Sequence, residues 1–99
     1  MATKKAGVLR AQQRAVRFTR PADYPTAYAN NAQVTMSNWD FRIDFGEVVS
    51  ADDKEIVIQQ RIGVVMSPQH TKALAQVLTK NVEEYEKSFG ELKWGQESE

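Results

Sequence analysis

The residues best suited to chemistry lie in one short stretch, NWDFRIDFGEVV, at residues 38–49. Asp40, Asp44 and Glu47 are its acid–base candidates, because two carboxylates on either side of a bond can act as general acid and base. In an extended strand Asp40 and Asp44 would share one face, about 13 Å apart at about 3.3 Å per residue. That separation is too large for two groups that act on one bond. We therefore predict no catalytic pair here.

The same stretch is better explained as a charged strand face. Arg42 lies between Asp40 and Asp44, so the three side chains form a ladder of alternating charge. We expect Arg61, from a later strand, to extend this ladder across the sheet. A flat strand brings too few oxygen atoms together for a hard cation. We interpret these residues, with the neighbouring Trp39, as a solvated or partner-contacting surface.

His70 is the only histidine of the chain, and there is no cysteine. A histidine can shuttle protons or bind a metal. A zinc site, however, needs three or four nitrogen, sulfur or oxygen ligands, and the sequence has no glycine-rich phosphate loop, G-x-S-x-G or HExxH. We predict a structural role for His70, and we expect no catalytic residues, no metal site, no cofactor and no enzymatic activity.

The first 20 residues form a basic arm. They carry six basic residues and no acidic one, whereas residues 21–99 have a net charge of −6. Such an arm can contact nucleic acid through phosphates, in a salt-sensitive and sequence-independent way. It can equally contact the acidic body of its own chain or of another subunit. The arginines recur every three or four residues, so a short helix would align them: Arg10, Arg14, Arg17 and Arg20.

From Ala32 onward, apolar residues alternate with polar ones, which is typical of half-buried strands. We predict strands near residues 32–37, 40–48 and 55–66, separated by the turn-like segments SNWD and SADDKE. In the second strand Phe41, Ile43 and Phe45 share the core face. A bulge or bend is predicted at Gly63, where the alternation shifts. The pattern indicates a three-stranded antiparallel meander.

A long helix is predicted after the third strand. Ser67 suits the N-cap, Pro68 the first turn and Gly90 the C-terminal cap, so the helix should run from Pro68 to Phe89, about 33 Å. We expect its apolar stripe to pack on the core face of the sheet. The stripe consists of Leu74, Val77, Leu78, Val82 and Tyr85.

These elements predict an α+β fold with one domain. The chain has 99 residues, and we divide it into a basic flexible arm and loop (1–27), a ββ-β-α domain (28–92) and a polar tail (93–99). One helix on three strands makes a thin core and leaves open sheet edges, so a homo-oligomer is expected and a dimer is favoured. The sequence contains no signal peptide and no membrane span, so we expect a cytoplasmic protein without a membrane contact.

The motifs DFxxDFG and MSPxHxKxL, preceded by YANN, resemble a family of short bacterial and archaeal proteins catalogued as domain of unknown function 3467. The resemblance covers about residues 28–92. It implies the meander-plus-helix fold and carries no activity. Our first hypothesis is a non-catalytic, oligomeric protein-interaction module of unknown pathway. The alternative is an accessory nucleic-acid-binding protein that uses the basic arm.

Overall fold

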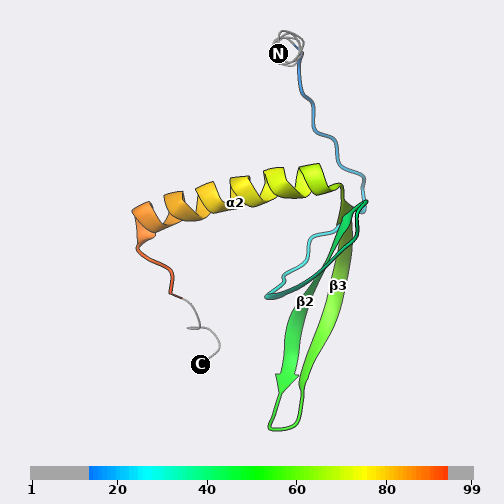
Figure 1. The fold of residues 1–99 in the computed structure, drawn as a ribbon, viewed down its shortest axis with the longest axis vertical. Helices are drawn as coiled ribbons and strands as arrows, with labels where there is room; N and C mark the ends of the chain where they lie inside the picture. Colours follow the sequence, from blue (N-terminus) through cyan, green and yellow to red (C-terminus); the bar gives the residue numbers. More distant parts are fainter. Residues whose placement is uncertain (1–13, 94–99) are drawn as a thin grey trace.

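The fold is a small antiparallel sheet followed by one long helix (Figure 1). The structure, a computed structural model, describes residues 14–93. The three strands pair in the order β1-β2-β3, all antiparallel. The predicted α+β meander with a C-terminal helix is therefore confirmed. The elements are β1 (Asn31–Met36), β2 (Phe41–Ala51), β3 (Ile56–Met66) and α2 (Pro68–Phe89).

The first turn joins β1 to β2 through the predicted SNWD segment. The Ser37 amide donates to the Asp40 carbonyl at 2.9 Å, and the Ser37 hydroxyl accepts from the amide of Trp39 at 3.0 Å. Ser side chains often stabilise turns through such local bonds. Asp40 consequently lies in the turn, one residue before β2, rather than at the start of the strand.

The second turn joins β2 to β3 and is organised by one carboxylate. The side chain of Asp52 accepts from the amides of Lys54 and Glu55, at 2.8 and 2.9 Å. These two bonds favour the charged carboxylate and hold the pKa of Asp52 below its ordinary value. This turn also falls where the sequence predicted it.

The hairpin has two irregularities, and neither lies at the predicted residue. One register shift separates Phe45 from Gly46, and there Arg61 is the additional residue of β3; a second lies between Val48 and Ser50, where Val49 is the additional residue of β2. Gly63 stays in register, opposite Asp44. The predicted bulge at Gly63 is therefore wrong, because the extra residue enters the strand two positions earlier.

Helix α2 has the predicted bounds and caps. The Ser67 hydroxyl accepts from the amide of His70 at 3.1 Å. At the other end Gly90 has φ 102°, and its amide donates to the Glu86 carbonyl at 2.9 Å. Although α2 has 22 residues, no helix within residues 14–93 is long and apolar enough to cross a membrane.

The expected packing of the helix on its own sheet is wrong. α2 has almost no contact with the three strands, and it extends away from the β2–β3 hairpin (Figure 1). Only Ser67 separates Met66 from Pro68, and its backbone is extended, with φ −64° and ψ 156°. Connections from a strand to a helix that packs beside it usually need two to six residues. A single extended residue cannot turn the helix back.

As a result, one chain has almost no interior. Gly46 is the only residue classed as buried within residues 14–93. The radius of gyration is 18.3 Å, compared with about 13 Å for a compact chain of about 100 residues. The accessible surface is 9431 Å², compared with about 5,700 Å² for a folded monomer of this mass. The hydrophobic core that the sequence pattern implies is not assembled within a single chain.

The segment before β1 is irregular and runs close to β2 at its end. Residues 14–30 form neither helix nor strand. The described part of the arm is therefore not the short helix that the arginine spacing suggested, and residues 1–13 lie outside the described part. Near the sheet, the Asn30 amide donates to the Gly46 carbonyl, and the Asn30 side chain accepts from the Val48 amide, both at 3.0 Å. Asn30 thus fixes the segment to β2.

Candidate interaction surface

One face of the sheet is apolar and only partly covered, and we call it the apolar sheet face. Residues that are opposite each other in register point to the same side, so three rows of three apolar side chains form this face. Met36 is 75% exposed, Val34 is 56% exposed and Ile62 is 40% exposed. Such an extended apolar surface is typical of an interaction site. The rows are Met36–Phe41–Met66, Val34–Ile43–Val64 and Ala32–Phe45–Ile62.

A second uncovered apolar surface runs along the helix, and we call it the α2 stripe. Its members recur at helical spacing, and most of them are about half exposed. Tyr85 and Phe89 form an aromatic pair on it, with ring centroids 4.9 Å apart and planes tilted by 45°. The stripe comprises Leu74, Val77, Leu78, Val82, Tyr85 and Phe89.

The opposite face of the sheet is polar and internally paired. The Arg42 guanidinium donates through Nε to both carboxylate oxygens of Asp44, at 3.0 and 3.2 Å. This ion pair lies over Gly63, where an added Cβ would come within 2.6 Å of Arg42 Nη2. Gly63 therefore leaves room for the pair. The predicted charged face is present, but Asp40 belongs to the turn and not to this face.

Arg61 does not extend that ladder, contrary to our expectation. Its guanidinium pairs with the carboxylate of Glu47 at 2.7 Å, and the two side chains are 37% and 33% exposed. Arg61 is the additional residue of β3 at the register shift beside Gly46, so it has no residue directly opposite it in β2. Next to Arg61 is a shallow hollow of about 300 Å³ at one end of the apolar sheet face. It is lined by Pro25, Ala27, Ala29, Phe45, Arg61 and Ile62.

Trp39 occupies the tip of the β1–β2 turn. Its side chain is 84% exposed, while the neighbouring Asp40 carboxylate accepts from the Ser37 hydroxyl at 3.4 Å. Large exposed aromatic side chains often anchor protein interfaces. Trp39 therefore fits the predicted role of a partner contact, whereas Asp40 shapes the turn that presents it.

The described arginines of the arm lie on an exposed segment. Arg14, Arg17 and Arg20 are all exposed, and Arg10 lies outside the described residues. The Arg20 guanidinium is 4.7 Å from the centroid of the Tyr24 ring, a cation–π contact within the arm. Phe18 is 91% exposed. The arm thus offers positive charge and one aromatic ring without a helix to align them.

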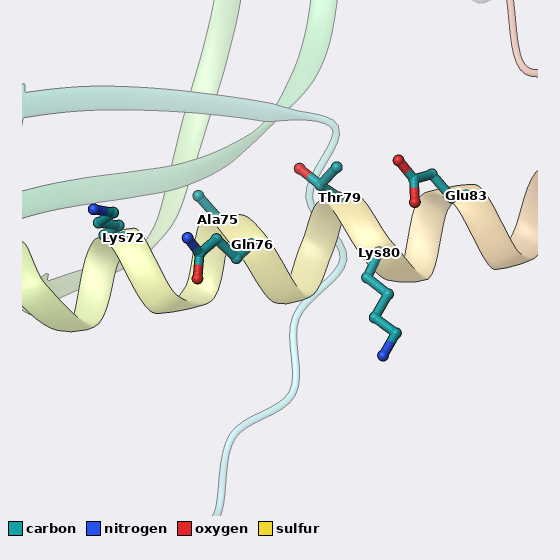
Figure 2. Close-up of a pocket in the computed structure, with 6 residues that line it drawn as sticks. All are labelled: Lys72, Ala75, Gln76, Thr79, Lys80 and Glu83. Carbon is teal, nitrogen blue, oxygen red and sulfur yellow. The ribbon is translucent and has the colours of Figure 1, made fainter. Parts of the chain in front are cut away.

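The back of α2 offers a flat polar surface and no enclosed site. Figure 2 shows six side chains along it, all from this one helix. His70, one turn before Leu74, is exposed, and the contact shown is that of its backbone amide with Ser67. Within residues 14–93, no three His, Cys, Asp or Glu side chains gather as a metal site would require. The surface in Figure 2 consists of Lys72, Ala75, Gln76, Thr79, Lys80 and Glu83.

A family model matches residues 1–94 of the chain. The match is wider than the resemblance noted over residues 28–92, and it includes the basic arm. No curated protein and no solved structure matches the chain. The description of the family is "Protein of unknown function (DUF3467)".

Proposed function

We propose that this chain, which belongs to the DUF3467 family, is a non-catalytic protein-interaction module that works as a homo-oligomer, with a dimer as its basic unit. One observation carries the proposal. The apolar sheet face and the α2 stripe are both uncovered in a chain that buries only Gly46 among residues 14–93. Apolar surface of this extent is stabilised when another surface removes it from water.

The exposed area is large enough for a dimer interface. The chain exposes about 3,700 Å² more surface than a folded monomer of its mass. If each chain buried only a third of that excess, a dimer interface would total about 2,500 Å². Interfaces of about 2,000–5,000 Å² are typical of obligate homodimers.

Light scattering on a gel-filtration peak tests this proposal. We expect a mass of at least twice the 11.2 kDa of one chain. Leu78→Asp, in the α2 stripe, should lower that mass, because it places a charge in the interface. The matched control is Gln76→Asp on the polar back of α2, which should leave the mass unchanged. A wild-type mass of one chain would contradict the proposal.

The alternative function is accessory nucleic-acid binding through the basic arm. It is supported by the exposure of Arg14, Arg17 and Arg20 and by the exposed ring of Phe18 beside them. Arginine side chains contact phosphates, and an aromatic ring can stack on a base. Such binding would be independent of sequence.

A gel-shift titration with mixed DNA and RNA at about 50 and about 200 mM salt tests the alternative. We expect Arg17→Glu combined with Arg20→Glu to abolish binding and its salt dependence. Lys72→Glu combined with Lys80→Glu changes the charge equally on the surface of Figure 2, and it should leave binding intact. If both double variants lost binding equally, the arm would not be the binding site. The same conclusion would follow if a chain without residues 1–20 bound nucleic acid as strongly as the full chain.

A further inference from the structure

We infer that the apolar sheet face of one copy is covered by helix α2 of a second copy, in a reciprocal exchange. Each chain then supplies the helix for its partner's sheet. This inference rests on the proposed homo-oligomer and names the two surfaces that meet. Three features of the chain support it: the connection between β3 and α2, the dimensions of the two surfaces, and the position of the polar side of α2.

The connection prevents the helix from covering its own sheet. Ser67 is the only residue between β3 and α2, and it is committed to the helix cap. Its hydroxyl accepts from the His70 amide, and its carbonyl accepts from the amide and the hydroxyl of Thr71, at 2.9 and 2.8 Å. Pro68 also restricts the preceding residue to extended backbone. No residue is left to reverse the chain, and a short connection of this kind favours exchange of an element between copies.

The α2 stripe is long enough to cross the apolar sheet face. Four residue steps separate Phe41 from Phe45, about 13 Å, and the three strands span about 10 Å. The diagonal of the apolar sheet face is therefore about 16 Å. Along α2, the fifteen steps of the stripe from Leu74 to Phe89 cover about 22 Å. The stripe of a second copy can thus cross the whole face.

The polar side of the helix is placed correctly for this arrangement. The residues in Figure 2 lie on the side of α2 away from the stripe, so they would stay in water when the stripe packs on a sheet. A two-fold axis makes both contacts equivalent and covers two sheets and two helices at once. Contact of sheet with sheet would leave both stripes uncovered.

Disulfide trapping tests the exchange, because the chain has no cysteine of its own. Chains with Ile43→Cys on the sheet and chains with Leu78→Cys on the helix carry different tags, are refolded together and are then oxidised. We expect a mixed disulfide-linked dimer that contains one chain of each kind. Replacing the helix variant by Gln76→Cys, on the polar back of α2, should abolish this product.

The outcomes separate this inference from the proposed function. A wild-type chain with the mass of a monomer, together with no covalent product, would overturn both. A dimeric wild-type chain whose variants link only sheet to sheet or helix to helix would overturn the exchange and leave the dimer intact. If the wild-type chain were dimeric but Gln76→Cys and Leu78→Cys linked equally well to Ile43→Cys, the exchange would also be overturned. The stripe would then have no preference for the sheet.

Discussion

The two faces of the sheet differ in whether their side chains find contacts within one chain. On the polar face, Arg42 and Asp44 form an ion pair that lies over Gly63, so these charges are paired within the chain. On the apolar sheet face, no helix covers the side chains of β1, β2 and β3, and only the segment around Pro25, Ala27 and Ala29 lies beside one end of it. The same three strands therefore carry one face whose charges are paired and one face whose apolar side chains are not covered by the helix. The apolar sheet face is therefore the surface that we propose to be covered by another chain.

Two adjacent valines give the sharpest test of this difference. Val64 lies on the apolar sheet face, opposite Ile43, and Val65 lies on the polar face, opposite Arg42. Val64→Asp should abolish dimerisation and cooperative unfolding, because an unpaired charge in the interface costs several kcal/mol and domains are stable by only about 5–15 kcal/mol. Circular dichroism and light scattering measure both properties.

Val65→Asp is the control, since it adds the same charge one residue further along β3. It gains Arg42 as a cross-strand neighbour, and we expect the dimer and its unfolding midpoint to be nearly unchanged. If the two variants behaved alike, the faces would not differ in the way described.

The second prediction removes the constraint that keeps the apolar sheet face uncovered. Insertion of about six Gly and Ser residues between Met66 and Ser67 gives α2 a connection long enough to turn back. We expect the mass to fall to about that of one chain, with the helix content unchanged. The same insertion after Asp53, in the β2–β3 turn, should leave the assembly intact. A lengthened chain that stays dimeric would show that the connection does not direct the exchange.

The third prediction compares two glycines of the hairpin. A Cβ at Gly46 would come within 2.9 Å of the Gln59 carbonyl oxygen, which is backbone and cannot move aside. At Gly63 the nearest atoms are the ends of the Arg42 and Asp44 side chains, which can rotate away. Gly46→Ala should therefore destabilise the protein by about 1–3 kcal/mol, and Gly63→Ala by about 1 kcal/mol or less. Urea unfolding measures both, and the reverse order would contradict the described contacts.

The smallest expected effect concerns pH and the β2–β3 turn. The pKa of Asp52 is lowered in the folded chain by the amides of Glu55 and Lys54. A lowered pKa means that the carboxylate supports the turn above its unfolded pKa, and that this support is lost as pH falls through the folded value, below about pH 4. NMR titration should show the amide signals of Lys54 and Glu55 following the Asp52 titration.

Asp52→Asn is the matched variant for this titration. Its amide oxygen can still accept from both backbone groups, so the turn should persist while the pH dependence of the two signals disappears. Unchanged titration of these amides in the variant would assign the effect to another group.

The local elements could be predicted from the sequence because their signals are local. Alternation defined the strands, and the cap residues Ser67 and Gly90 defined both ends of α2. The apolar residues of β2 and of the helix were also identified correctly as members of one face of each element. Periodicity states which side of an element is apolar, but it does not state which chain covers that side. The prediction that α2 packs on the sheet of its own chain was therefore wrong.

The pairing of charges was predicted only in part, for a related reason. Arg42 and Asp44 lie on one strand, two residues apart, so alternation alone brought them together. Arg61 and Glu47 belong to different strands, and their contact depends on the register shift beside Gly46. The additional residue in β3 changes the cross-strand partners of Gly46 to Val48, until the additional residue Val49 in β2 restores the register. The opposite charges of Glu47 and Arg61, each near the middle of its strand, were the available signal.

That Gly46 alone is buried among residues 14–93 also has a kinetic consequence. An isolated chain gains little by folding, so folding and association should form a single second-order event. The refolding rate would then rise with protein concentration. Each tenfold increase in concentration would add about 1.4 kcal/mol to the apparent stability of the dimer. The amount of this protein that a cell makes would thereby set the fraction of it that is folded.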